Sequence, residues 1–155
     1  GFAAAHALIA AWPVPLSAAV WGVEIHPLML LMAPALLLYL ALVFWTLGYD
    51  TIYALQDIED DALAGIKSSA RALGPRARAG VAGFYALALA LWAAALWIVA
   101  GQALAVLALL PLAAQMGWQV VKLADTAPAN ALLLFRSNRL AGALWAAACA
   151  SVGLA

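Results

Sequence analysis

Stretches without a single charged residue place the strongest constraint on how this chain can fold. The longest runs from residue 79 to residue 121, and three others cover residues 1–23, 25–49 and 140–155. A helix needs about 20 mainly apolar residues to cross the hydrocarbon layer of a membrane. Apolar residues make up 69% of the chain and charged residues only 9%, against about half and about a quarter in soluble domains. So few charges cannot provide a water-compatible surface, and we expect a protein of the lipid bilayer.

The uncharged stretches predict an all-α fold, a polytopic bundle of five transmembrane helices. The stretch 79–121 is about twice as long as one crossing requires, and Gly101-Gln102 is a turn signal that divides it. Helices are favoured because they satisfy their own backbone hydrogen bonds, which lipid cannot do. The helices are expected at residues 3–22, 28–48, 79–100, 103–121 and 139–155, in a single membrane domain of residues 1–155 with a loop at 49–78.

The basic residues predict the orientation of this bundle. Five crossings place segments 49–78 and 122–139 on the same side, whereas connections 23–27 and 101–102 lie on the other side and contain no lysine or arginine. The first two segments hold all seven basic residues: Lys67, Arg71, Arg76, Arg78, Lys122, Arg136 and Arg139. The positive-inside rule puts them on the cytoplasmic side of a bacterial inner membrane, or on the matrix side of a mitochondrial one. A net charge of zero offers no basic face for nucleic acid.

An acidic cluster carries the chemistry, because nine charged residues lie between Asp50 and Arg78. If the helix at 28–48 continues, Asp50 and Asp57 differ by about 20° around its axis, and Asp57 and Asp61 by about 40°. Three carboxylates on one face repel one another, so we expect a cation between them. Their hard oxygens suit Mg²⁺, which is commonly shared between one or two carboxylates and the phosphates of a substrate.

The position of the cluster indicates the kind of substrate. Carboxylates are costly in lipid and belong at the interface or in a wet cavity. An apolar bundle with carboxylates at its mouth fits a substrate with an apolar tail and a diphosphate head. Lys67 and Arg71 are candidates for direct phosphate contacts. The alternative from spacing alone is a solvated loop that only fixes topology.

Two strings of residues resemble a known family. Residues 49–74 read YDTIYALQDIEDDALAGIKSSARALG, and residues 135–139 read FRSNR with Gly142 shortly after. The first string resembles the second aspartate-rich region of the UbiA superfamily of intramembrane prenyltransferases, in particular its 4-hydroxybenzoate polyprenyltransferase branch. The second resembles the stretch before the family's last helix.

The resemblance implies a fold and an extent. Family members have nine membrane helices around a central cavity and two aspartate-rich motifs. The first motif, of the type N-D-x-x-D-x-x-x-D, is not found in these 155 residues. The five helices would then correspond to the fifth to ninth of the family. We therefore expect the C-terminal part of a longer enzyme, inactive in isolation because it lacks half of the metal site.

The resemblance also assigns roles to particular residues. Asp57 and Asp61 would bind Mg²⁺ that bridges to the diphosphate, and Asp50 would line the same catalytic pocket. Tyr53, Lys67 and, beyond the recognisable core, Arg71 would position the diphosphate. Arg136 and Asn138 belong to the second string; contact with substrate and a purely structural role both remain open for them.

The implied activity is Mg²⁺-dependent transfer of a polyprenyl group from polyprenyl diphosphate to the aromatic ring of 4-hydroxybenzoate, in ubiquinone biosynthesis. The leaving diphosphate would be neutralised, and the allylic carbon would bond to the ring carbon ortho to the phenol. Two alternatives stay open. One is another enzyme of the superfamily, acting in menaquinone, haem O or chlorophyll synthesis; the other is a membrane transporter or structural subunit without enzymatic activity.

Overall fold

The computed structural model describes residues 27–153, and every element in this range is a helix. The expected helix at 3–22 lies outside the described residues. The four long helices are α2 (Pro27–Ala54), α5 (Ala77–Ala100), α7 (Leu110–Lys122) and α8 (Pro128–Gly153). The short helices are α3 (Ile58–Leu63), α4 (Ser69–Leu73), the 3₁₀ turn η1 (Gly74–Arg76) and α6 (Ala103–Leu107). The predicted all-α fold is confirmed.

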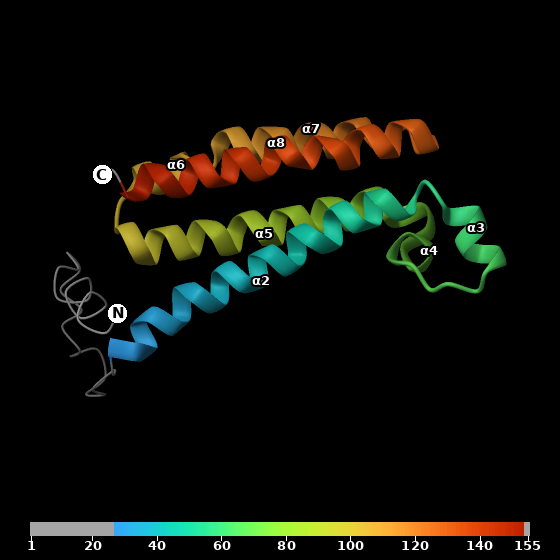
Figure 1. Ribbon diagram of the computed structural model, residues 1–155. Coiled ribbons are helices and arrows are strands. Elements are labelled where there is room, and N and C mark those ends of the chain that lie inside the picture. The colour runs from blue at the N-terminus through green and yellow to red at the C-terminus, as the bar shows by residue number, and fades with distance from the viewer. Residues whose placement is uncertain (1–26, 154–155) are drawn as a thin grey trace.

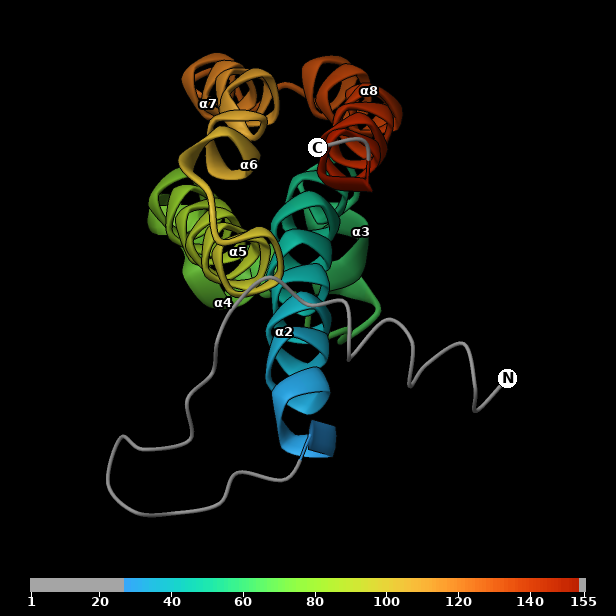
Figure 2. The ribbon, with the colours of Figure 1, turned by 90° about the vertical axis from the view of Figure 1, so that its left-hand side faces the viewer.

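The long helices lie side by side in a bundle, as Figures 1 and 2 show. Helix α2 packs along α5, and α8 contacts both α2 and α7. Helices α3 and α4 and the connection from α7 to α8 all lie at one end of the bundle in Figure 1, and the turn between α5 and α6 lies at the other end. We call the first of these the charged end. The two basic segments therefore do meet at the same end of the bundle.

Three stretches in residues 27–153 are long and apolar enough to cross a membrane. These are Met32–Ala54, Ser69–Ala100 and Ala103–Lys122. Helix α8 has 26 residues but is not among them; the polar run Arg136-Ser137-Asn138-Arg139 lies within it. The lengths and composition of these helices agree with an integral membrane protein.

Small residues allow α2 and α5 to approach closely. Ala41 on α2 and Ala88 on α5 are fully buried, as is common where membrane helices touch. Gly48 makes the closest approach: a Cβ atom at this position would lie 2.4 Å from Cε1 of Tyr85. The ring of Tyr85 thus occupies the space that a side chain at position 48 would need.

The segment expected as a loop at 49–78 is largely helical, which corrects that prediction. Helix α2 continues to Ala54, and α3, α4 and η1 follow before α5 begins at Ala77. Helix α2 extends because one face of its last turns is buried: Thr51 and Ile52 are fully inaccessible to solvent and Leu55 nearly so. Burial of this face stabilises turns that charge alone would have placed in solvent.

Two other helix limits also differ from the expectation. The last helix begins at Pro128 rather than at residue 139, and proline is favoured at a first helical position because its missing N–H has no partner there anyway. The stretch 103–121 is divided into α6 and α7. Pro111 lies in the first turn of α7 and cannot donate a hydrogen bond back to α6, so the helix is interrupted before it.

Candidate functional site at the charged end

The last turns of α2 have one buried face and one exposed face. On the buried face, Thr51 Oγ1 lies 2.8 Å from Ser69 Oγ, a hydrogen bond that joins α2 to α4. Thr51 also donates to the backbone oxygen of Leu47 at 2.6 Å. Asp50 and Tyr53 are exposed. These two predicted site residues therefore lie off the fully buried face that Thr51 and Ile52 form.

The helix break after Ala54 separates Asp50 from the other two aspartates. Gln56 covers the end of α2 by donating both its backbone N–H, at 3.0 Å, and its side-chain amide, at 3.3 Å, to the oxygen of Tyr53. Asp57 then stands at the N-cap of α3. The condition under which the three carboxylates would share one face, a continuous helix, is not met, because the chain turns between residues 55 and 57.

Asp57 and Asp61 remain together. The backbone N–H of Asp61 donates to the oxygen of Asp57 at 2.8 Å, which places the two residues one helical turn apart. Asp57 is exposed and Asp61 half-buried. Within residues 27–153, no group of three or more His, Cys, Asp or Glu side chains is close enough to hold a metal ion. The described residues thus offer a pair of carboxylates.

This pair fits a magnesium ion that a substrate also binds. Mg²⁺ prefers oxygen ligands, keeps several waters, and is usually held by one or two carboxylates together with phosphate oxygens. Asp57 and Asp61 supply hard oxygen donors on the exposed side of the charged end. A soft or fully protein-ligated metal would need more donors than the pair provides.

The segment after α3 contains both cations expected to bind diphosphate. Lys67 and Arg71 are exposed. Arg71 lies on α4, and its Nη1 atom donates to the backbone oxygen of Asp61 at 3.1 Å and to that of Ile66. The side chain of Arg71 thus contacts the end of α3 at the backbone oxygen of Asp61.

Aromatic rings join the charged end to the interior of the bundle. Phe135 on α8 packs against Tyr49 and Tyr53 on α2, with ring centroids 6.0 and 4.8 Å apart. Tyr49 in turn packs against Trp45 at 5.5 Å, and Trp45 against Trp92 at 5.8 Å. The ring of Tyr53 is therefore held at the contact between α2 and α8, with 45% of the residue still exposed.

Asn138, for which the sequence leaves a substrate contact and a structural role open, lies in a partly buried polar cluster. Its Oδ1 accepts a hydrogen bond from Trp45 Nε1 at 3.0 Å, and its Nδ2 donates to Gln119 Oε1 at 3.4 Å. Gln119 Oε1 also accepts from the hydroxyl of Tyr85 at 2.6 Å. This cluster of Trp45, Tyr85, Gln119 and Asn138 joins α2, α5, α7 and α8.

Sequence reasoning missed three members of this polar cluster. Gln119 is fully buried and Tyr85 nearly so. A usable signal was present: Gln115 and Gln119 are four residues apart in an otherwise apolar helix, and polar groups inside a membrane bundle need partners on neighbouring helices. Arg136 lies on α8 and is exposed; its backbone oxygen accepts a hydrogen bond from Arg139 Nε at 3.3 Å.

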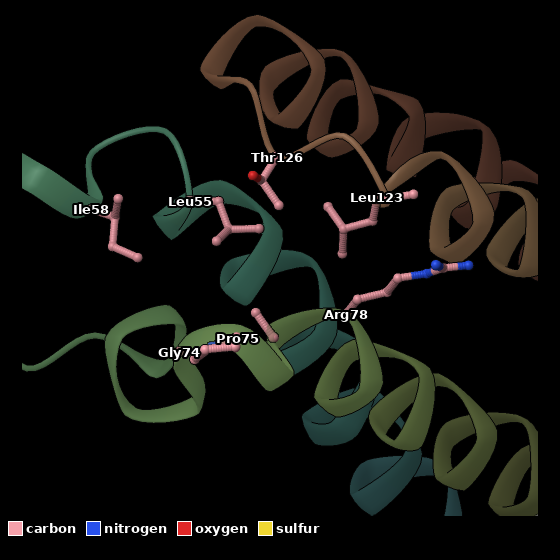
Figure 3. A pocket seen from close by; sticks show the side chains of 9 residues that line it. Leu55, Ile58, Gly74, Pro75, Arg78, Leu123 and Thr126 are labelled. Carbon is pink, nitrogen blue, oxygen red and sulfur yellow. The ribbon is translucent and has the colours of Figure 1, made fainter.

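A cavity of about 380 Å³ lies at the charged end between the turn after α2, η1, the start of α5 and the connection from α7 to α8 (Figure 3). Its walls are mainly apolar, with Leu55, Ile58 and Leu123 among them. Figure 3 shows Arg78 turned toward α7, where its Nε donates to the oxygen of Val120 at 2.9 Å. None of the residues predicted from the sequence to bind metal or diphosphate lines this cavity.

The fold and the site together define a helical membrane protein with paired carboxylates and cations at one end of its bundle. The chain belongs to the UbiA prenyltransferase family, whose sequence model matches residues 3–152. The predicted resemblance is therefore confirmed. No solved structure matches the chain.

Curated relatives have closely related names. The 4-hydroxybenzoate octaprenyltransferase of Hahella chejuensis is 53% identical over 55 residues, which is 36% of this chain and 18% of the relative. That of Methylibium petroleiphilum is 38% identical over 100 residues, 64% of this chain and 32% of the relative. The mitochondrial 4-hydroxybenzoate polyprenyltransferase of Arabidopsis thaliana is 39% identical over 120 residues, 72% of this chain and 28% of the relative. The chain thus spans less than a third of the length of each.

Proposed function

We propose that this chain forms the second aspartate-rich part of an enzyme that transfers a polyprenyl group from polyprenyl diphosphate to the ring of 4-hydroxybenzoate. Membership of the UbiA prenyltransferase family and the names of the curated relatives support this activity. The observation that carries the proposal is the placement of Asp57, at the N-cap of α3, and Asp61 one turn apart, at one end of a bundle of membrane-length helices.

Asp57 and Asp61 are the residues that would hold Mg²⁺. When bound there, the ion would neutralise negative charge on the diphosphate of the substrate. The pair suits this task because two carboxylates leave coordination positions open for phosphate oxygens.

Lys67 and Tyr53 are proposed to bind the diphosphate itself. Lys67 is exposed four residues after α3, and an ammonium group is a compact point charge for phosphate. The ring of Tyr53 is fixed against Phe135 at 4.8 Å, which leaves its hydroxyl as the polar end of an ordered side chain. Asp50, exposed near the end of α2, is proposed to line the same polar mouth.

The apolar bundle is proposed to exclude water from the reacting carbon. In the transfer, the bond between the allylic carbon and the diphosphate oxygen breaks, and that carbon bonds to the ring carbon ortho to the hydroxyl. The same ring carbon then loses its proton, which restores aromaticity. Water would compete for the electron-poor allylic carbon. The aromatic side chains of Trp45, Tyr49 and Phe135 line the seam between α2 and α8 and provide a surface that disfavours water.

The proposal extends to location and pathway. The seven basic residues favour a cytoplasmic or matrix position for the charged end. Polyprenylated 4-hydroxybenzoate is a precursor of the type that ubiquinone biosynthesis requires, and we assign the activity to that pathway.

The test is an assay of the complete protein in membranes with 4-hydroxybenzoate and a radiolabelled polyprenyl diphosphate. We expect a labelled aromatic product that depends on Mg²⁺ and disappears with EDTA. D61N should lower the rate at least about 100-fold, the size of effect typical for loss of an electrostatic catalytic group. D125N is the matched control, since Asp125 is a carboxylate in the connection from α7 to α8 whose Oδ1 accepts from the N–H of Ala127, and asparagine keeps that acceptor.

Two outcomes would contradict the proposal. Full activity of D61N would remove the aspartate pair from the mechanism. Absence of product with 4-hydroxybenzoate, together with product from a different aromatic or isoprenoid acceptor, would move the protein to another branch of the family.

A further inference from the structure

Helix α3 ends in a turn that is closed by backbone hydrogen bonds. The N–H of Ile66 donates to the oxygen of Asp61 at 2.9 Å, and the N–H of Gly65 donates to that of Ala62 at 3.3 Å. Gly65 has φ +71°, a left-handed conformation that glycine adopts without strain. This pair of bonds is the Schellman motif. It reverses the chain directly between Asp61 and Lys67.

Arg71 adds a side chain to this turn from the following helix. Its Nη1 atom donates to the oxygen of Asp61 at 3.1 Å and also to the oxygen of Ile66. The backbone oxygen of Asp61 thus accepts from both the N–H of Ile66 and Nη1 of Arg71. The guanidinium group therefore connects the last turn of α3 to the residue that precedes Lys67.

Helix α4, which carries Arg71, is itself attached to the body of the bundle. Ala70 is fully buried, and Ser69 is hydrogen-bonded to Thr51 of α2 at 2.8 Å. Helix α3 has much less support of its own. It contains six residues, too few for a helix to be stable alone, and Leu63 near its end is 89% exposed.

We infer that Arg71 is a positioning residue, which holds Asp61 in place by tying the end of α3 to α4 through the carbonyls of Asp61 and Ile66. The effect of this role on catalysis rests on the proposed function. The role itself differs from the direct diphosphate contact that the sequence predicts for Arg71. Arginine suits it because a planar guanidinium group presents several fixed N–H donors. Lysine has one rotatable ammonium group and would reach the two carbonyls less well.

The experiment has a structural readout and a kinetic readout on the complete protein in nanodiscs. R71M removes the donors, R71K keeps the charge, and R76M is the control, because Arg76 is an exposed arginine of the same segment. Hydrogen–deuterium exchange of residues 58–67 should become about tenfold faster in R71M, as expected for loss of charge-assisted hydrogen bonds that protect a local unit. The exchange rate in R71K should be intermediate, and R76M should match the wild type.

The kinetic readout separates a positioning role from direct phosphate binding. In R71M, the Mg²⁺ concentration for half-maximal activity should rise about tenfold, because Asp61 is less well placed, and activity should recover at high Mg²⁺. KM for the polyprenyl diphosphate at saturating Mg²⁺ should change less than about twofold. These magnitudes follow from the loss of one hydrogen bond to a charged group.

Two results would overturn the inference. Unchanged exchange of residues 58–67 in R71M would mean that Arg71 does not hold this turn. A raised KM for the diphosphate with an unchanged Mg²⁺ requirement would make Arg71 a direct ligand. If the wild type forms no prenylated product, the proposed function fails, and the exchange measurement still decides whether the tie from Arg71 to α3 exists.

Discussion

The indole nitrogen of Trp45 on α2 donates a hydrogen bond to the side-chain oxygen of Asn138 on α8, at 3.0 Å and across 93 positions of sequence. Hydrogen-bonding groups inside an apolar bundle have few alternative partners, so such a pair favours one register of the two helices. The register matters at the charged end. Phe135, three residues before Asn138, lies against Tyr53 with 4.8 Å between the ring centroids.

Replacing Asn138 by leucine should therefore destabilise the bundle. The variant removes the acceptor for Trp45 and the donor to Gln119, and we expect the free energy of unfolding to fall by about 1–2 kcal/mol. Denaturant titration of the protein in detergent, followed by tryptophan fluorescence, would measure this. R139Q, at an exposed position one residue later, should match the wild type. Equal stability of N138L would show that the cluster does not hold the helices together.

Gly48 provides a steric prediction. In G48A, the new methyl group would lie 2.4 Å from the ring of Tyr85, and the overlap should lower the free energy of unfolding by about 1–3 kcal/mol. G83A and G117A are matched controls, because a Cβ atom at either position meets no atom within 4 Å. Since alanine is the better helix former, their stability should stay the same or rise.

The double variant G48A/Y85L identifies the cause of that loss. Leucine removes the ring that the new methyl group would meet, so the combined loss of stability should be smaller than the sum of the two single losses. Additive losses would place the strain of G48A elsewhere in the bundle. Thermal unfolding of the four proteins in one detergent completes the cycle.

The sequence predicts the membrane helices well because lipid imposes a simple requirement on composition. Helix α5 ends at Ala100, where Gly101 adopts a left-handed conformation with φ +65°, and the turn signal at Gly101-Gln102 predicts this from residue type alone. The extension of α2 through Asp50 to Ala54 could not be predicted from charge. It depends on burial of Thr51 and Ile52 against segments that come later in the chain.

The sequence predicts which residues form the candidate site, but it predicts their arrangement in space only partly. The spacing of Asp57 and Asp61 predicts one shared turn, and the backbone bond between them agrees. Asp50 could be added to the same face only on the assumption of a continuous helix, which the turn at residues 55–57 removes. The backbone contacts of Arg71 have no local signature, because they depend on how α4 folds back onto α3.

The hydrogen bond between Thr51 and Ser69 gives a prediction about the segment that carries the site. T51V and S69A each remove one partner of the 2.8 Å contact and should each cost about 1 kcal/mol of unfolding free energy. The double variant should cost little more than either single variant, since the same bond is lost. Fully additive losses in denaturant titrations would mean that the two hydroxyls act separately.

Tyr53 allows the binding role and the packing role of one side chain to be separated. Y53F keeps the ring against Phe135 and removes only the hydroxyl. If that hydroxyl binds the diphosphate, KM for the polyprenyl diphosphate should rise about tenfold, the equivalent of one hydrogen bond to a charged group. The free energy of unfolding should stay unchanged.

Y53A also removes the ring contact and should in addition lower the free energy of unfolding by about 1 kcal/mol, since aromatic pairs contribute on that order. Steady-state kinetics and denaturant unfolding on the same membrane preparations distinguish the two roles, because an unchanged KM in Y53F would leave Tyr53 with packing alone.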